Sequence, residues 1–366
     1  MKTLTRTRAL GAVALAGALA LALSACGAAP EETGGSAAPG GEADTGFLAC
    51  GGSDEGSWNG KSFNEAAFGG LEKAEADLGV TISDAESASP DDFQPNLDIM
   101  ISEGCDVTFA VGFNFSIGDL IFNVADANPD SHFVWIDGWN QGQTNLKPIQ
   151  YSMEQSSFLA GYLAAAYSES KVVGTYGGGK GEVDAVNIFM DGFYYGAKYY
   201  EAESGTPVKV IGWDPATKTG DFVDDFANSG QASSITTGQL AQGADVIFPV
   251  AGGLFTASAE VIRAGSSPAV IIGVDKDIAV TQPDYADLIL TSVEKRMTQA
   301  VFDVVKSLSE GEAFDVEPYI GTLENDGTAL SSFGEFDDKV PAEVKTKLDE
   351  IKAGIIDGSI DPLALP

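Results

Sequence analysis

The sequence has 366 residues, of which 54 are acidic and 20 are basic, so its formal net charge is −34. A chain with this charge repels phosphate backbones, which argues against nucleic acid as a partner. Its length exceeds what a single hydrophobic core usually holds, so we expect two lobes.

The first segment has the layout of a bacterial export signal. Lys2 and Arg8 precede an uncharged run at 9–23, which is too short for a comfortable membrane span. The run ends in LSAC, which resembles the lipobox of bacterial lipoproteins. We therefore expect residues 1–25 to be a cleaved signal peptide and Cys26 to carry the lipid anchor. The alternative is an ordinary buried cysteine in an N-terminal anchor.

The next segment has the composition of a linker. Residues 26–45 are rich in Gly, Ala, Pro, Glu and Ser and lack an apolar period, which predicts a flexible tether before a folded part that starts near Phe47. Two further cysteines, Cys50 and Cys105, form a candidate disulfide in an exported protein. Two buried thiols are the alternative, because sequence alone does not show that the Cα atoms come close enough.

A helix rich in polar and aromatic residues at its start follows the first apolar run. Ser62 and Glu65 have the spacing of a capping box. Asn64 and Phe68 lie one turn apart at the flank of the predicted apolar stripe, where they could form the rim of a ligand cleft. The stripe itself contains Ala67, Leu71, Ala74 and Leu78.

The rest of the chain alternates apolar runs with helical patterns. Continuous β-branched runs between helices predict an α/β fold with doubly wound parallel sheets covered on both faces. The natural division between two lobes falls near residue 150. Ligands of such sheets bind at the carboxyl ends of the strands. The expected strand ends carry Phe113, Asp137, Gly138, Trp213, Gly252, Gly253 and Asp275.

Motifs for covalent or metal chemistry are weak. The run from Gly174 to Lys180 has part of the P-loop spacing, but Gly181 stands where a Ser or Thr should hold magnesium. The one histidine, His132, lies without a nearby nucleophile motif, and the acidic cluster at 221–226 lacks the calcium-loop pattern. The sequence therefore predicts no catalytic residues, no metal site and no cofactor. Aromatic and hydrogen-bonding residues at strand ends instead suit noncovalent capture of a small, flat, polar molecule.

Seven segments of the sequence carry a resemblance to a known family. In chain order they are KSFNEAAFGGL, EGCDVTFAVGF, NPDSHFVWIDG, EQSSFLAGYLAA, GADVIFPVAGG, IIGVDKD and TSVEKR. Together they resemble the basic membrane protein family, the PnrA-like nucleoside-binding lipoproteins of ABC transporters. The resemblance implies a type I periplasmic-binding-protein fold, in which two doubly wound lobes are joined by a hinge of three crossovers. It also implies a purine nucleoside in the cleft.

The resemblance also suggests how the chain divides. We expect an N-terminal lobe at 46–150 with part of 276–312, and a C-terminal lobe at 151–275 with part of 313–366.

One group of site residues follows from the family's base-binding motifs. The resemblance implies that the base stacks between Phe68 and Phe226, with Asn64 on the same wall. The family usually has an aspartate pair before the KSFN segment, where this chain has Asn59 and Gly60. Because an amide donates as well as accepts hydrogen bonds, Asn59 could change the preferred base. Either phenylalanine could instead be a core residue.

A second group follows from the family's remaining contacts. The resemblance implies that Asp137 and Gly252 contact the nucleoside, and that Asp275 and Lys295 hold the ribose hydroxyls. Alternatively, the two aspartates could cap the turns that follow them, and Lys295 could be a surface cation.

These observations lead to one functional hypothesis and two rivals. We expect a monomeric, lipid-anchored solute-binding protein on the extracytoplasmic face of the cell membrane, which captures a nucleoside and delivers it to an ABC permease. One rival is a lipoprotein sensor or surface interaction protein that uses the same ligand-binding fold. The other is an exported enzyme such as a nucleoside hydrolase, which the motifs favour least.

Overall fold

The structure, a computed structural model, describes residues 46–179, 181 and 183–365. These belong to one compact unit, Glu42–Pro366. The expected signal peptide (1–25), the lipidation site Cys26 and the tether (26–45) lie outside the described residues. None of the helices in the described part of the chain is long and apolar enough to cross a membrane.

The first lobe is built on a parallel sheet with the strand order β13-β5-β4-β3-β1-β2. Helix α1 packs against α9, and α2 packs against β1 and β2. The central strands are buried on both faces, as continuous apolar runs predict. The strands are β1 (Leu48–Glu55), β2 (Thr81–Ser87), β3 (Val107–Val111), β4 (Phe133–Ile136), β5 (Leu146–Tyr151) and β13 (Tyr319–Gly321); the helices are α1 (Phe63–Leu78), α2 (Phe93–Glu103), α3 (Leu120–Ala127) and α9 (Met297–Ser309).

The second lobe is built on a sheet with the order β14-β12-β11-β10-β6-β7. Strand β14 runs antiparallel to β12, and the other pairings of this sheet are parallel. The strands are β6 (Val172–Gly177), β7 (Lys209–Ile211), β10 (Val246–Val250), β11 (Val270–Asp275), β12 (Ile289–Lys295) and β14 (Thr328–Leu330), with a ribbon of β8 (Trp213–Asp214) and β9 (Thr219–Gly220); the helices are α4 (Met153–Tyr167), α5 (Asp184–Ser204), α6 (Ser229–Ala241), α7 (Phe255–Ala264), α8 (Ile278–Thr281) and α10 (Ala342–Ile356).

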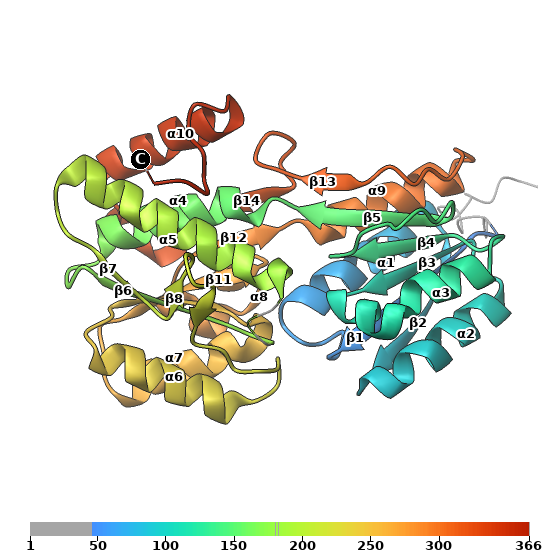
Figure 1. The fold of residues 1–366 in the computed structure, drawn as a ribbon, viewed down its shortest axis with the longest axis horizontal. Coiled ribbons are helices and arrows are strands. Elements are labelled where there is room, and N and C mark those ends of the chain that lie inside the picture. The colour runs from blue at the N-terminus through green and yellow to red at the C-terminus, as the bar shows by residue number, and fades with distance from the viewer. Residues whose placement is uncertain (1–45, 180, 182, 366) are drawn as a thin grey trace, which may run out of the picture. The chain divides into compact units, whose positions relative to one another are not determined.

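The chain passes between the two sheets three times (Figure 1). It leaves the first sheet after β5, returns to the first lobe between β12 and α9, and leaves again between β13 and β14. Within 276–312, β12 therefore belongs to the second sheet, whereas α9 packs on the first lobe. Within 313–366, β13 belongs to the first sheet, and α10 packs on α4 of the second lobe.

The apolar stripe predicted for α1 faces the core. Ala67, Leu71 and Ala74 are buried, and Leu78 is half-buried at the end of the helix. Gly79 then ends the helix in a left-handed conformation, which glycine adopts without steric cost.

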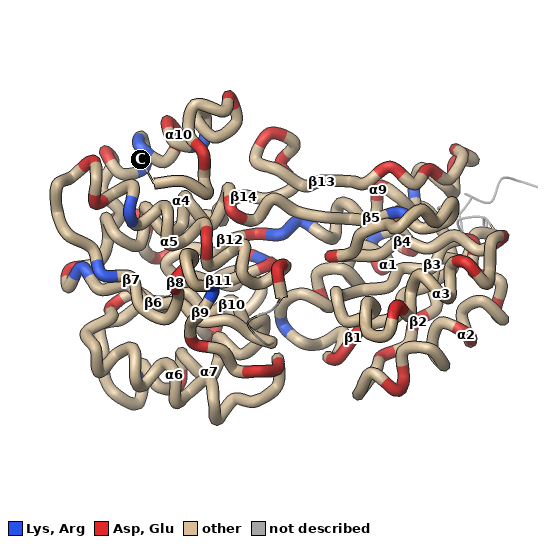
Figure 2. Tube along the Cα trace, viewed as in Figure 1, with Lys and Arg blue, Asp and Glu red and all other residues tan. Residues whose placement is uncertain are grey.

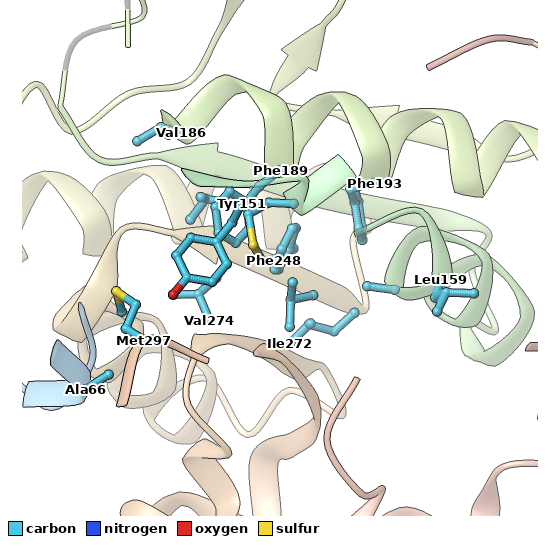
Figure 3. Close-up of a cluster of buried hydrophobic side chains, with 14 of the residues drawn as sticks. Ala66, Tyr151, Leu159, Val186, Phe189, Phe193, Phe248, Ile272, Val274 and Met297 are labelled. Carbon is cyan, nitrogen blue, oxygen red and sulfur yellow. The ribbon is translucent and has the colours of Figure 1, made fainter. Parts of the chain in front are cut away.

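The core of the second lobe brings α4 and α5 into close contact. A Cβ atom at Gly196 would lie only 1.9 Å from the backbone oxygen of Phe158, so a larger residue there would push the helices apart. Around this contact, Phe189 and Phe193 of α5 pack in the same hydrophobic cluster as Tyr151 and Val274 (Figure 3). Tight helix packing thus fixes the position of α5, whose first turns reach the cleft.

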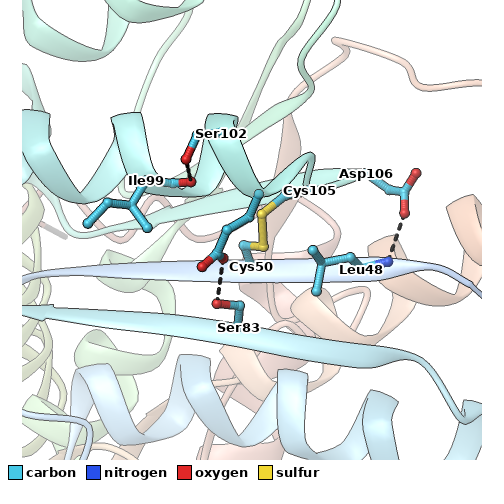
Figure 4. Close-up of a disulfide and its surroundings, with 8 residues drawn as sticks. Leu48, Cys50, Ser83, Ile99, Ser102, Cys105 and Asp106 are labelled. Carbon is cyan, nitrogen blue, oxygen red and sulfur yellow. Dashed lines mark hydrogen bonds between the residues drawn. A yellow bond between two sulfur atoms is a disulfide. The ribbon is translucent and has the colours of Figure 1, made fainter.

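A disulfide between Cys50 and Cys105 joins β1 to the segment just before β3 (Figure 4). The Cα atoms of the two residues are 6.0 Å apart, and 55 positions separate them in the sequence. The bond closes a long loop that contains β2 and α2, so it removes many conformations from the unfolded chain.

We expect the disulfide to stabilise the folded state by about 2–4 kcal/mol, the typical value for such a bond. Urea unfolding of the oxidised protein, with and without a reductant, measures this difference. A Cys50→Ala/Cys105→Ala double variant is the control, because its stability should be lower and insensitive to the reductant. Equal stability of the oxidised and reduced protein would contradict the prediction.

Candidate functional site

A cavity of about 140 Å³ lies between the two lobes, where carboxyl ends of strands from both sheets come together. Residues of β1, the turn after β4 and the start of α1 line it from the first lobe, and residues of β11, β12 and α5 line it from the second. This is the edge of a parallel sheet at which ligands are expected. Of the predicted site residues, Asn64, Asp137, Phe226, Gly252, Asp275 and Lys295 line the cavity.

A buried ion pair joins the two lobes inside the cavity. The Nζ atom of Lys295, at the end of β12, donates to both carboxylate oxygens of Asp137, after β4, at 2.8 and 2.7 Å. The exposed fractions of the two side chains are only 3% and 8%. Aromatic rings of Phe63, Tyr151 and Phe189 lie within 5.1–5.5 Å of the ammonium group, which stabilises the buried charge.

A second polar contact crosses the cleft at Asp275. The hydroxyl of Ser62, at the start of α1, donates to Oδ2 of Asp275 at the end of β11. Burial raises the pKa of Asp275, while Lys295 and the Ser62 hydrogen bond act in the opposite direction. Asp275 and Asp137 both have a positive φ, an uncommon conformation that turns the chain sharply at the strand end.

Asp54, at the carboxyl end of β1, is a cavity residue that sequence reasoning missed. Burial raises the pKa of Asp54 well above its usual value, and the negative charge of Asp137 raises it further. Hydrogen bonds from the Asn64 side chain and the Asn114 backbone lower it only in part. Asp54 packs against Gly112, where a Cβ atom would lie 1.9 Å from its Oδ2. The strand-end rule that selected Asp137 and Asp275 would also have selected Asp54.

Asn64, which lines the cavity, carries a buried acceptor without a partner in the described part of the chain. The residue is buried, and its Oδ1 atom has no hydrogen-bond partner among the described residues. A buried polar atom without a partner costs free energy, so a ligand that donates to this oxygen would gain more than it would at an exposed site.

Aromatic side chains form the apolar walls. Phe226 of the second lobe and Phe113 of the first face each other with ring centroids 6.1 Å apart, and Phe63 and Phe189 line the same cavity. The glycine-rich turn after β6 positions Phe226, because a Cβ atom at Gly178 would lie 2.4 Å from its ring. The turn that resembled a nucleotide-binding loop in sequence therefore packs against the acidic segment at 221–226.

Two predicted site residues lie elsewhere. The ring of Phe68 stacks on Trp58 with centroids 4.9 Å apart and is not among the described residues that line the cavity. The expected sandwich of Phe68 and Phe226 is therefore absent from this structure, since Trp58 occupies one face of the Phe68 ring. Asn59 is exposed, whereas its neighbours Ser57 and Gly60 line the cavity.

The capping box predicted at the start of α1 is wrong. Ser62 directs its hydroxyl to Asp275 rather than to the helix backbone. Glu65 instead accepts a hydrogen bond from Lys276 of the second lobe at 2.7 Å. Both side chains bond to residues of the second lobe. These long-range hydrogen bonds take the place of the local capping bonds to the backbone of α1.

The cleft is closed in this structure. The Ser62–Asp275 hydrogen bond and the Glu65–Lys276 ion pair join α1 to the end of β11. A Cβ atom at Gly253 would lie 2.6 Å from the backbone oxygen of Gly60, so the backbones of the two lobes are in direct contact there. Such contacts hold a bound molecule away from water.

The electrostatics of the cavity disfavour anionic ligands. Acidic residues are spread over both lobes (Figure 2), and Asp54, Glu55, Asp137 and Asp275 line the cavity. Lys295 is the one cation among the described residues that line it, and Asp137 already pairs with this charge. A phosphate or a free carboxylate would therefore enter without a counter-charge, whereas hydrogen-bond donors would find acceptors.

His132 lies away from this cavity. Its ring stacks on Phe314 with centroids 4.4 Å apart, and its Nδ1 atom lies 3.2 Å from the backbone oxygen of Asp106. These contacts give the histidine a structural role at the opposite end of β4 from Asp137.

Comparisons with known proteins agree with the fold. A family model described as ABC transporter substrate-binding protein PnrA-like matches residues 49–320. The chain belongs to this family. Its members are substrate-binding proteins, as the sequence resemblance implied.

Individual relatives span most of the chain. A CD4+ T-cell-stimulating antigen of Listeria monocytogenes is 28% identical over 323 residues, which cover 84% of this chain and 85% of the relative. The ABC transporter nucleoside-binding protein BmpA of Lactococcus lactis is 25% identical over 320 residues, with 82% and 85% covered. A solved solute-binding protein of an Aeropyrum pernix ABC transporter superposes with a TM-score of 0.76 at 22% identity, over 86% of this chain and 92% of the other. This similarity confirms the predicted two-lobed periplasmic-binding fold.

The raised pKa of Asp54 predicts a stability effect with a definite sign. Because the native-state pKa lies above the unfolded value, the ionised carboxylate destabilises the native state at neutral pH. The penalty fades as the pH falls through the raised pKa toward the unfolded value of ~3.9. Asp54→Asn should therefore raise the melting temperature at pH 7.5 by roughly 2–4 °C for each kcal/mol recovered, and by less at pH 4.

Thermal unfolding of the unliganded protein at the two pH values checks this expectation. Asp130→Asn is the matched control, because Asp130 is an exposed aspartate in a turn. A lower melting temperature for Asp54→Asn at pH 7.5 would mean that the carboxylate stabilises the native state, the opposite of the expected sign.

Proposed function

We propose that this chain is a lipid-anchored receptor on the extracytoplasmic face of the membrane, which captures a nucleoside and delivers it to an ABC permease. Membership of a substrate-binding family supports the transport role. The name of the Lactococcus lactis relative supports the ligand class. The lipobox-like LSAC segment ending at Cys26 supports the anchor. The receptor acts as a monomer and does no covalent chemistry.

The observation that carries this proposal is the combination of aromatic walls, buried acceptors and a neutralised cation in one closed cavity. A nucleoside is flat at its base, rich in hydrogen-bond donors and uncharged. Amino acids and nucleotides carry an anionic group, for which this cavity offers no free positive charge among the described residues. Simple sugars lack the flat ring that Phe113 and Phe226 are suited to contact.

The base is proposed to bind at the end of the cavity that contains Phe226. The ring of Phe226 stacks on the base, and Phe113, whose ring centroid lies 6.1 Å from that of Phe226, contacts the edge of the base. Asp54 and the free Oδ1 of Asn64 then accept hydrogen bonds from the edge of the base. Purines suit this end because two fused rings offer a larger stacking face than a pyrimidine.

The sugar is proposed to bind beside Asp275 and Lys295. Ser62 donates to one oxygen of Asp275, which leaves the other oxygen to accept from a ribose hydroxyl. Lys295 has donated to Asp137 and retains a third N–H bond for the sugar. Gly252 lines the same cavity, where a glycine lets the ligand approach the backbone.

The stacking role predicts different effects for two phenylalanines. Phe226→Ala should weaken nucleoside binding by roughly 5- to 150-fold, since a base stacked on an aromatic side chain contributes ~1–3 kcal/mol in single-strand binders. Phe68→Ala is the control, because Phe68 contacts Trp58 rather than the cavity. Phe68→Ala should lower the melting temperature and leave the affinity for nucleosides nearly unchanged. Calorimetric titration with inosine and adenosine tests both, and equal affinity losses would overturn the assignment of Phe226.

The sugar site predicts selectivity for the 2′-hydroxyl. A 2′-deoxynucleoside leaves an acceptor of Asp275 unpaired, so it should bind roughly 5- to 150-fold more weakly than the ribonucleoside, and the free base more weakly still. Asp275→Asn should reduce this discrimination. Titration of both proteins with inosine, 2′-deoxyinosine and hypoxanthine measures it. Equal affinity of the unmutated protein for all three compounds would remove Asp275 from the sugar site.

A further inference from the structure

A second, larger cavity adjoins the first along the Lys295–Asp137 ion pair. It has a volume of about 700 Å³ and shares Phe113, Asp137, Ala185 and Lys295 with the first cavity. The buried ion pair between Lys295 and Asp137 therefore forms a wall between two compartments. We call this second compartment the side cavity. A molecule bound beside Lys295 would lie next to both.

The side cavity has an unusually apolar rim. Of the eight large hydrophobic residues that are exposed in the described part of the chain, four line this cavity. They come from separate segments, the turn after β3, the turn after β4, strand β13 and the C-terminal tail. Exposed apolar side chains gathered at one place mark a surface that contacts another molecule. The four are Ile117, Trp139, Ile320 and Leu363.

Two buried polar atoms at this cavity have no partner among the described residues. One is the hydroxyl of Tyr151, whose side chain is 8% exposed, and the other is Oε2 of Glu154 in the first turn of α4. Burial raises the pKa of Glu154, and the charge of Asp361 raises it as well. Each atom is a hydrogen-bond acceptor that the described residues leave without a partner behind the wall of the cavity, and the Glu154 side chain is itself only partly buried.

The charges around the side cavity select the sign of that ligand. Glu154 and Asp184 line it, and the charge of Lys295 is already paired with Asp137. Lys295 is the one cation among the described residues that line it. An anionic group such as a phosphate would be repelled, whereas an ammonium group would pair with Glu154.

We propose that the side cavity is a second compartment of the ligand site, which accepts an amine carried on a short apolar linker at the 5′ position of a nucleoside. This inference rests on the proposed function, because it places the sugar beside Lys295 and directs its 5′ carbon past the ion pair. Trp139 and Ile320 contact the linker, and the carboxylate of Glu154 pairs with the amine. The receptor is then selective for nucleosides extended by a cationic group, not for nucleotides.

The test is a calorimetric titration of the purified full chain with a matched series of adenosine and inosine compounds. The four members of each series carry a 5′-hydroxyl, a 5′-ethylthio group, a 5′-(2-aminoethylthio) group or a 5′-monophosphate. The aminoethylthio compound should bind roughly 10- to 100-fold more tightly than the ethylthio compound, the range expected of a hydrogen bond to a charged group. The monophosphate should bind most weakly.

Two variants separate the contributions of the side cavity. Glu154→Gln should abolish the advantage of the aminoethylthio compound and leave the affinity for adenosine and inosine unchanged. Trp139→Ala should weaken both thioether compounds to a similar extent, because it removes an apolar contact shared by them.

The outcomes distinguish this inference from the function on which it rests. If neither adenosine nor inosine binds, the proposed function fails and the inference fails with it. If a parent nucleoside binds but the aminoethylthio compound has no advantage over the ethylthio compound, the inference alone is overturned. The same holds if Glu154→Gln retains the advantage.

Discussion

The ion pair between Lys295 and Asp137 is the interaction on which the site depends. It joins the end of β12 in the second lobe to the turn after β4 in the first, at one of the three crossovers. Removing one partner of a buried pair leaves an uncompensated charge and typically costs about 3–5 kcal/mol. The rings of Phe63, Tyr151 and Phe189 lie against the ammonium group, so α1, β5 and α5 each contribute an aromatic contact to this charge. The pair also determines what the cavity can bind, since it neutralises the cation that an anionic ligand would need.

The other contacts across the cleft follow from the same geometry. Parallel sheets bring the carboxyl ends of their strands to one edge, and two such edges face each other here. Asp54 and Asp275 are both buried at these edges, where an acceptor costs free energy unless a donor pairs with it. A ligand with several donors supplies that pairing.

Sequence reasoning predicted the fold and placed Asp137 and Asp275 at the carboxyl edges of the sheets because these depend on strand order and strand ends. Lys295 was expected only from the family resemblance, and it lines the same cavity. It did not predict Phe68 correctly, since the stacking of Trp58 on that ring depends on the conformation of the loop at 56–62. It also missed Asp54, although the same strand-end rule applies. The capping box failed for a related reason, because a local pattern cannot show that Ser62 has a better partner 213 positions away in the sequence.

Capture of a nucleoside is tested most simply by native mass spectrometry of the protein in an equimolar mixture of nucleosides, nucleotides, free bases, sugars and amino acids. The closed cavity, with its aromatic walls and paired cation, predicts a single complex whose added mass is that of a nucleoside. A complex with a nucleotide, a sugar or an amino acid in preference to every nucleoside would contradict the proposed ligand class.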